Sequence, residues 1–409
     1  MTTLTPLKNA AFRDPRLAPL LREAAARDLT STTVPSPKPS TTPARLRRAQ
    51  VVTMVVLLLL GAVAAVQQFD LRAQLGATPQ LAGQYDRLAT IEADLIEARN
   101  LASLQALGVA GVDPTTALND ASAQLVTAAA QRPTDQDGLA TVSQATLTYA
   151  GLLQTPSAAR LAKADELLTG TIQPTLQKLR AALQTETGQR SWSFSPVLLW
   201  LTVVAAAVGL LVVSVELAQR TRRTFNLGLV LAVVAAVTSA WLGLAGLNQA
   251  DAADQANRTG TFDQVVTLTN GRLTLADLRR QLTGAALAHN ASAEARAAIT
   301  ARLNDLSANT ELPYPSRSTV IDAYTAALGA VEKGDWATVT NDVAKAAEAD
   351  NIFTSKLSQT TASTITAGVN TTQAALNALL GQAIAALAFA LAGAGVGYWG
   401  ISRRLREYR

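Results

Sequence analysis

Four long runs of apolar residues, separated by polar segments, divide the chain. The runs contain no charged residue and lie at 51–66, 197–215, 227–247 and 379–401. An α-helix rises about 1.5 Å per residue, so each run approaches or exceeds the length that crosses a hydrocarbon layer of about 30 Å. The pattern therefore predicts four transmembrane helices, placed at 49–67, 195–217, 227–247 and 379–401.

The polar segments at 68–194 and 248–378 are long enough to fold outside the membrane. In the first segment, apolar residues recur at spacings of three, four and seven from Leu81 to Ala102, which is the repeat of one helix face. The motifs GVDP at 111–114 and RPTDQDG at 132–138 interrupt this pattern. Because each segment has enough residues for a core of its own, it is predicted to form an antiparallel helical bundle.

The second polar segment is similar to the first. The tripeptide Ala-Asp-Leu occurs at 93–95 and again at 276–278, an offset of 183 that also pairs Leu104 with Leu287. The order of membrane helix, polar segment and membrane helix is repeated as well, which indicates an internal duplication. The predicted fold class is an all-α membrane protein with four transmembrane helices and two extracytoplasmic antiparallel helical bundles, internally duplicated.

Basic residues gather at one set of predicted membrane boundaries. Nine Lys and Arg against three acids lie in the tail 1–48, and four Arg against one Glu lie in 402–409. The loop 218–226 adds Arg220, Arg222 and Arg223. Since basic flanks mark the cytoplasmic side, the sequence predicts a multi-pass protein of the cell membrane with both termini in the cytoplasm. The tail is rich in Pro and Thr and is predicted to be flexible.

The composition excludes most enzyme classes. The chain has no Cys and a single His, His289, so Cys/His metal clusters and the usual His-based catalytic arrangements are not available. No glycine-rich phosphate-binding loop is present. The sequence therefore predicts no enzyme activity, no catalytic residue, no metal and no cofactor, and His289 is interpreted as a helix-terminal or solvent-facing residue. The basic excess is spread over membrane boundaries, which argues against nucleic-acid binding.

The order of the elements resembles that of known membrane sensors. An outer helical bundle between two membrane helices is similar to the sensory modules of bacterial chemoreceptors and histidine kinases. The duplicated form, joined by the basic segment LAQRTRRTFNLGL at 217–229, resembles the four-span sensors of the bacterial pathway that couples amino-acid availability to protein kinase G. The resemblance covers residues 49–404 and rests on this architecture and on the RRTFN motif.

This resemblance implies partners on both sides of the lipid membrane. It implies a solute-binding lipoprotein that carries an amino acid outside the cell, and a serine/threonine kinase or adaptor in the cytoplasm. Arg220, Arg222 and Arg223 are the predicted partner-binding residues. The expected function is that of a receptor that detects an extracytoplasmic ligand and signals to a separate cytoplasmic protein. The ligand, direct or mediated sensing, and the oligomeric state, a homodimer included, stay open.

Two charged residues interrupt the apolar face of the first outer helix. Glu92 and Arg99 lie in line with Leu88 and Leu95, and a buried charge is costly unless it is paired, hydrated or close to a ligand. One interpretation is that both charges pair with neighbouring helices or face solvent. The other is that Arg99, with Asn100, binds the carboxylate of an amino acid or a loop of a binding protein, while Glu92 binds an ammonium group.

A channel or transporter is the main alternative function, and a structural membrane adaptor is a third. Transport proteins usually place ionisable groups or broken helices at membrane depth. Apart from aromatic residues, the four charge-free runs offer only hydroxyl and amide groups: Thr53, Thr202, Ser214, Thr238, Ser239 and Gln382. The glycines at 393, 395 and 397 are interpreted as sites of close helix packing.

Overall fold

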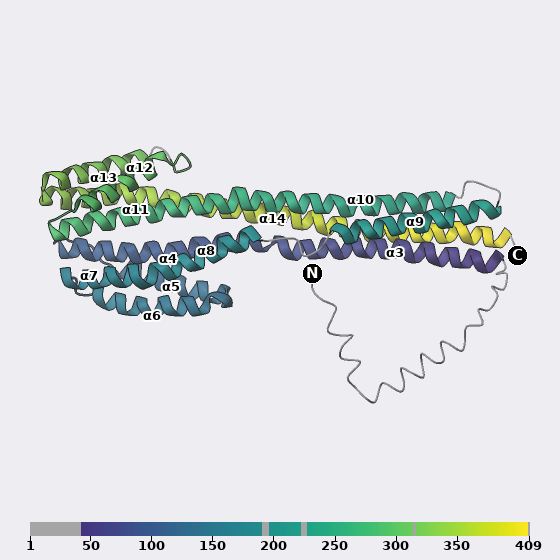
Figure 1. Cartoon of the computed structure of the whole chain (residues 1–409), viewed down its shortest axis with the longest axis horizontal. Helices are drawn as coiled ribbons and strands as arrows, with labels where there is room; N and C mark the ends of the chain where they lie inside the picture. Colours follow the sequence, from purple (N-terminus) through teal and green to yellow (C-terminus); the bar gives the residue numbers. More distant parts are fainter. Residues whose placement is uncertain (1–41, 190–195, 222–226, 314–315, 408–409) are drawn as a thin grey trace, which may run out of the picture.

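The protein is an elongated helical molecule in the computed structural model, which describes residues 42–189, 196–221, 227–313 and 316–407. All regular elements in these ranges are helices, which confirms the all-α prediction. One half of the long axis is a group of long helices and the other half carries shorter helices packed around their extensions (Figure 1). The predicted flexible tail lies mostly outside the described residues.

Four helices lie side by side at the end of the molecule that holds the start of α3 and the C-terminal end of α14 (Figure 1). They are α3 (Thr42–Leu75), α9 (Pro196–Thr221), α10 (Leu227–Gln255) and α14 (Trp336–Glu407). Among the described residues, three helical rods are long and apolar enough to cross a membrane, at Arg47–Ala106, Leu227–Ala288 and Trp336–Arg403. The apolar part described in α9 is shorter, Trp200–Val215.

The outward faces of these four helices are apolar. Large exposed apolar side chains include Val51, Leu59, Val204, Leu211, Val234, Val237, Leu391 and Trp399. A soluble protein rarely exposes so extensive an apolar surface, whereas a lipid environment favours it. Between the helices, a core formed by Leu57, Ala206, Ala232 and Ala394 joins all four of them.

Small residues allow α14 to pack closely against its neighbours. A Cβ atom on Gly393 would lie 2.6 Å from Cβ of Ala235, and one on Gly397 would lie 3.2 Å from Cγ2 of Thr53. A Cβ atom on Gly395 would meet no atom within 4 Å. Close packing is therefore confirmed for Gly393 and Gly397, and the prediction is wrong for Gly395, which lies on a different face of the helix.

The first outer bundle follows α3 almost without a break. Its helices are α4 (Ala77–Ala106), α5 (Thr115–Gln131), α6 (Gln136–Leu153), α7 (Ala158–Leu167) and α8 (Gln173–Gln189), with a 3-10 turn η1 (Pro133–Asp135) and a π-helical turn η2 (Leu168–Ile172). The two predicted interruptions are confirmed, because α4 ends before GVDP and α5 ends before RPTDQDG. Only Gly76 separates α4 from α3, so the two form one rod.

The second outer bundle is built on the extensions of α10 and α14. After the π-helical turn η3 (Ala256–Phe262) come α11 (Asp263–Ala288), α12 (Ala293–Ala308) and α13 (Ser316–Lys333), and the outer part of α14 completes the bundle. His289 ends α11 with a left-handed backbone, φ 47°, a common way to stop a helix. Its side chain is exposed, so the interpretation of His289 as a helix-terminal residue is confirmed.

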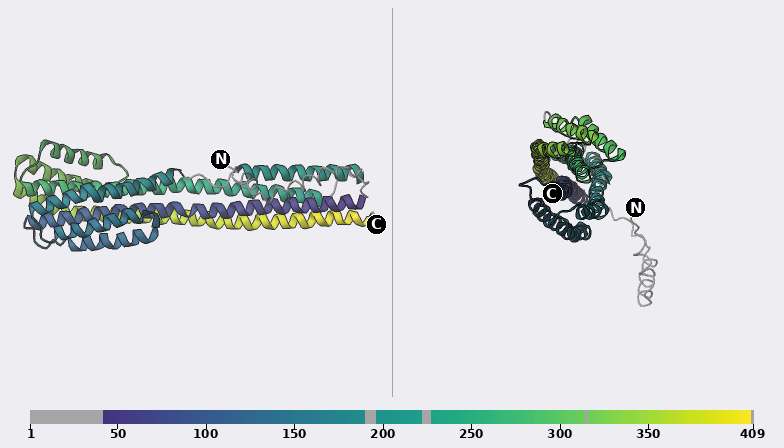
Figure 2. Two further views of the ribbon diagram at one scale, coloured as in Figure 1. Left: turned by 60° about the horizontal axis from the view of Figure 1, so that its bottom comes forward. Right: turned by 90° about the vertical axis from the view of Figure 1, so that its left-hand side faces the viewer.

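The two outer bundles have separate cores that meet at their contact. Phe262 and Val265 of the second bundle are buried in the core of the first, and Leu104 of the first is buried in the core of the second. The rings of Tyr85 and Phe262 meet edge to face with centroids 5.6 Å apart. Seen end-on, the helices gather around one long axis (Figure 2). Each bundle therefore contributes side chains to the core of the other.

Candidate functional site

The contact between the bundles is made by α4 and α11, which run parallel. Arg272 Nη2 donates to Thr90 Oγ1 at 2.7 Å, and Arg279 Nη1 donates to Glu97 Oε1 at 2.8 Å; both pairs are 182 residues apart in sequence. Arg99 Nη1 donates to Thr283 Oγ1 at 3.0 Å, across 184 residues. The separations of 182 and 184 residues are close to the offset of 183 between the two segments. Positions of α4 and α11 that are related by this offset therefore lie side by side at the same height along the molecule.

Arg279 is the most deeply buried charge of this contact. It lies on the face of α11 that meets α4, is 2% exposed, and donates to both carboxylate oxygens of Glu97. Asp350 Oδ2 of α14 lies 3.6 Å away and accepts a hydrogen bond from the hydroxyl of Tyr324 at 2.9 Å. Burial and the proximity of Asp350 raise the pKa of Tyr324, so the phenol remains a donor. One arginine thus links α4, α11 and α14.

A cavity of about 200 Å³ lies beside Arg279. It is lined by Thr90, Ala93, Asp94 and Glu97 of α4, by Arg272, Ala276 and Arg279 of α11, and by Asp350, Asn351, Thr354 and Ser358 of α14. The lining therefore combines two guanidinium groups with three carboxylates and several neutral polar groups. Such a cavity can bind a small ligand that carries both charges, such as a zwitterion.

Asp94 differs from the other charged residues of the cavity. Within the part of the chain that the structure describes, its carboxylate makes no hydrogen bond or ion pair, whereas Glu97, Arg272, Arg279 and Asp350 are all paired. Burial raises the pKa of Asp94 to about 7, and the nearby positive charge of Arg272 opposes this shift. A cation or a proton would therefore stabilise the carboxylate of Asp94. A buried carboxyl group with a strongly shifted pKa in a cavity is typical of functional sites.

We expect the outer bundles to be more stable at about pH 5.5 than at about pH 8. The pKa of Asp94 in the folded protein, about 7, lies above the ordinary value of 3.8, so the stabilisation that protonation gives is lost as the pH rises through 7. Asp94→Asn should flatten the dependence of the thermal midpoint on pH and raise the midpoint at about pH 8. The matched variant Asp137→Asn, at an exposed position of α6, should keep the wild-type profile. Identical profiles for both variants would contradict this role of Asp94.

The predicted ligand residues lie at or near the contact, and each of them already makes a hydrogen bond or an ion pair. Arg99 pairs with Asp165 of α7, Nη2 to Oδ2 at 2.6 Å, and Asn100 Nδ2 donates to the carbonyl of Ala276 at 3.2 Å. Glu92 pairs with Arg180 of α8. The structure thus shows the pairing interpretation, and none of Glu92, Arg99 and Asn100 lines the cavity. Their role in ligand binding stays a prediction, because a ligand would have to displace these partners.

Sequence reasoning missed the arginines that do line the cavity. Arg272 and Arg279 are seven residues apart in the first outer helix of the second segment, the same spacing that drew attention to Glu92 and Arg99. Applying the search for charges on an apolar face to both segments would have found them. In the sequence, Asp94 is distinguished only as part of the repeated tripeptide Ala-Asp-Leu.

The predicted partner-binding residues lie at the other end of the molecule. Arg220 belongs to the last turn of α9, and Arg222 and Arg223 lie outside the described residues. Their role stays a prediction. In the described ranges, no group of three or more His, Cys, Asp and Glu residues is arranged to hold a metal ion.

Comparison with known proteins adds no relative: no family model, no curated protein and no solved structure matches the chain.

Proposed function

We propose that the protein is a membrane receptor that detects a ligand outside the cell and signals to a separate protein in the cytoplasm. One observation carries this proposal. The charged cavity is lined by α4, α11 and α14 alone, and these are the outer extensions of the three rods long and apolar enough to cross a membrane. A ligand in the cavity would therefore touch each of these rods directly.

The continuity of the rods gives a mechanical route for the signal. Helix α14 runs without a break from Trp336 to Glu407, so Asp350 at the cavity and Arg403 beyond the apolar part are joined by about 80 Å of helix. A ligand that draws two of the rods together, or pushes them apart, biases their relative height or rotation in the membrane. Any such effect must be reciprocal, because an inner partner that prefers one arrangement also changes the affinity for the ligand.

The chemistry of the cavity favours an amino acid as the ligand, received directly or from a solute-binding lipoprotein. Asp94 offers an unpaired carboxylate that can bind an ammonium group. Arg272 and Arg279, which line the same cavity, are the guanidinium groups that can bind a carboxylate. On the inner side, a serine/threonine kinase or adaptor is the proposed partner, with Arg220, Arg222 and Arg223 at or near its docking site. These identities rest on the resemblance to amino-acid sensors of the protein kinase G pathway.

A channel or transporter is not favoured by the packing of the membrane helices. Between α3, α9, α10 and α14 lie two apolar clusters and a few uncharged polar side chains, and no charged residue is among the buried residues described there. Thr53, Gln68 and Ser239 each donate a hydrogen bond to a helix carbonyl. A transport path needs polar or ionisable groups along its length. The receptor proposal therefore fits this half of the molecule better.

The proposed orientation places both termini inside, four helices in the membrane and both bundles outside. The chain has no cysteine, so single cysteines report on each position without background. We expect an impermeant thiol reagent to label cysteines at Ser122 and Ser307 in intact cells, and both positions are exposed on the outer bundles. Cysteines at Ser36 and Ser402 should react only after the cells are opened. Labelling at Ser36 in intact cells would overturn the orientation.

The output of the receptor is expected to leave through the inner tail. Deleting residues 2–44 should abolish or strongly weaken recruitment of the cytoplasmic partner while membrane insertion is kept, because Arg45, Arg47 and Arg48 remain as the basic flank. Recruitment is measured by co-purification of cytoplasmic proteins from cells. A second variant with Arg222→Gln and Arg223→Gln tests the loop separately. Normal recruitment by the deletion variant would assign the output to the loop or the C-terminal tail.

A further inference from the structure

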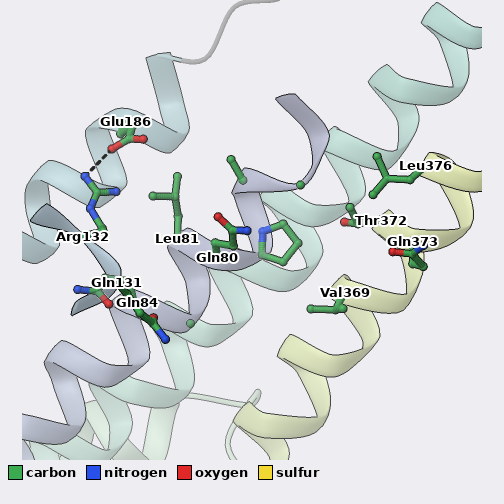
Figure 3. A pocket seen from close by; sticks show the side chains of 14 residues that line it. Gln80, Leu81, Gln84, Gln131, Arg132, Glu186, Val369, Thr372, Gln373 and Leu376 are labelled. Carbon is green, nitrogen blue, oxygen red and sulfur yellow. Dashed lines mark hydrogen bonds and ion pairs between the residues drawn. The ribbon is translucent and has the colours of Figure 1, made fainter. Parts of the chain in front are cut away.

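A second and larger cleft lies between the first outer bundle and α14. Its volume is about 730 Å³, and it is bounded by the first two turns of α4, the end of α5, the end of α8 and the middle of α14. Figure 3 shows Leu81 and Gln80 on one wall and Val369, Thr372, Gln373 and Leu376 on the opposite wall. The cleft is distinct from the charged cavity, with which it shares no lining residue.

Most of the lining surface is apolar, with amide and hydroxyl groups between, and none of the described lining residues carries an unpaired charge. Four glutamines face or border the cleft: Gln80, Gln84, Gln131 and Gln373. Among the described lining residues, the charged ones are Arg132 and Glu186, which pair with each other, Nη2 to Oε2 at 2.9 Å. Leu81, Val369 and Leu376 add apolar surface. An occupant must therefore be neutral, able both to donate and to accept hydrogen bonds, and partly apolar.

These properties select among ligand classes. A phosphate or a metal ion requires unpaired charge, which the lining does not offer. A nucleobase favours aromatic stacking, and no aromatic residue is among the described lining residues. The volume falls in the range of about 300–1,000 Å³ that holds ligands larger than a single small metabolite.

A peptide main chain has the required chemistry, because it presents one donor and one acceptor at each residue. Glutamine side chains carry the same amide group and can pair with both. Gln84 is 1% exposed and already bonded at both its amide nitrogen and its amide oxygen. Among the described residues, the whole amide of Gln80, the nitrogen of Gln131 and the oxygen of Gln373 remain for an occupant. We propose that this cleft binds a short, extended and uncharged peptide segment of a protein partner outside the membrane. Its apolar side chains would contact Leu81, Val369 and Leu376.

A helical glycine keeps the cleft open. Gly83 lies in the second turn of α4 and lines the cleft, and a Cβ atom there would meet no other atom within 4 Å. Glycine inside a helix reduces helix stability, and no close approach of another element requires it here. A side chain at this position would fill the cleft without disturbing the packing.

Binding in this cleft would join the first bundle to α14 of the second. The inference rests on the proposed function only for the side of the membrane on which the cleft lies. It adds a partner contact close to the membrane, separate from the small-ligand cavity. A peptide held there would favour arrangements in which α4 and α14 stay close.

The test uses the purified full chain in phosphatidylcholine nanodiscs and a random pool of capped hexapeptides built from uncharged residues. Peptides retained by the protein are identified by mass spectrometry. We expect wild type to retain a subset of the pool and Gly83→Leu to retain these peptides at least about tenfold less. Gly151→Leu is the matched control, since it lies in helix α6 with no atom near its Cβ position and outside the cleft. Its retention should equal that of wild type.

Three results would overturn the proposal. The first is no retention by wild type above empty nanodiscs, and the second is equal retention by wild type and Gly83→Leu. The third is loss of the retained peptides on addition of maltotriose, which would assign the cleft to saccharides. The thermal midpoint of Gly83→Leu should match or exceed that of wild type, which shows that lost binding is not lost folding. Retention does not depend on signalling, so this outcome is separate from the fate of the receptor proposal.

Discussion

Replacing Arg279 by methionine is expected to lower the free energy of unfolding of the outer bundles by about 3 kcal/mol. The substitution keeps most of the side-chain volume but leaves Glu97 and Asp350 without their cation. Asp350 is 6% exposed, so its charge cannot be hydrated in place. The value is set at the lower end of the usual range because the side chain of Glu97 keeps 32% exposure and can turn to solvent.

Thermal or denaturant unfolding of the protein in nanodiscs measures this effect. The matched variant Arg302→Met removes an arginine that is 46% exposed and lies 3.7 Å from Asp277, and it should cost less than about 1 kcal/mol. A double-mutant cycle tests the pair itself. The loss of unfolding free energy in the double variant, Arg279→Met with Glu97→Gln, should be smaller than the sum of the losses in the two single variants, because the two side chains interact. Equal effects of Arg279→Met and Arg302→Met would mean that the buried pair does not hold α4 to α11.

A second large effect is expected in the membrane half. Gly393→Leu should destabilise the packing of α14 on α10 by about 3 kcal/mol or more, since even a methyl group there would lie 2.6 Å from Cβ of Ala235. Gly395→Leu is the matched control, two residues away on a face with no atom near the Cβ position, and should change stability by less than about 0.5 kcal/mol.

The yield of monodisperse protein after extraction and its thermal midpoint measure this difference. Gly393→Leu should aggregate or unfold at a lower temperature, while Gly395→Leu should behave as wild type. Similar behaviour of the two variants would show that α14 does not pack on α10 through the face that holds Gly393.

Local features of the chain were predictable because local chemistry determines them. The breaks at GVDP and RPTDQDG follow from Gly and Pro, and the seam of α4 is buried as its spacing predicted, with Leu88 and Leu95 fully enclosed. The apolar repeat begins at Leu81, four residues after the start of α4 at Ala77, because Gly76 alone is too weak a signal to mark the join with α3. Helix boundaries are the least certain part of such predictions.

The contact between the bundles was predictable only in part. The offset of 183 came from a repeated tripeptide, and the pairs of Arg272 with Thr90 and Arg279 with Glu97 have nearly this separation. A duplication alone does not predict that α4 and α11 pack side by side. Their contact depends on how two segments far apart in the sequence meet in space. For the same reason Asp94 could not be recognised as the unpaired carboxylate of a cavity before its neighbours on α11 and α14 were known.

The parallel pairing also bears on oligomeric state. Through α4 and α11 the two outer bundles lie parallel and side by side within one chain, an arrangement that two subunits related by a two-fold axis would also produce. The described residues that line the cavity between the bundles all belong to this one chain.

The receptor proposal is tested most directly by coupling across the membrane. A photoreactive residue at Ser36 in the inner tail, activated in intact cells, reports which cytoplasmic protein binds and how well. The proposed function predicts capture of a cytoplasmic signalling protein by wild type and by the control Asp137→Asn, and a change of about fivefold or more in its yield for Asp94→Asn, a residue at the outer cavity. The proposal would be contradicted if no cytoplasmic protein were captured. It would also be contradicted if the yield were the same in all three proteins and liposomes that contain the purified chain released solute.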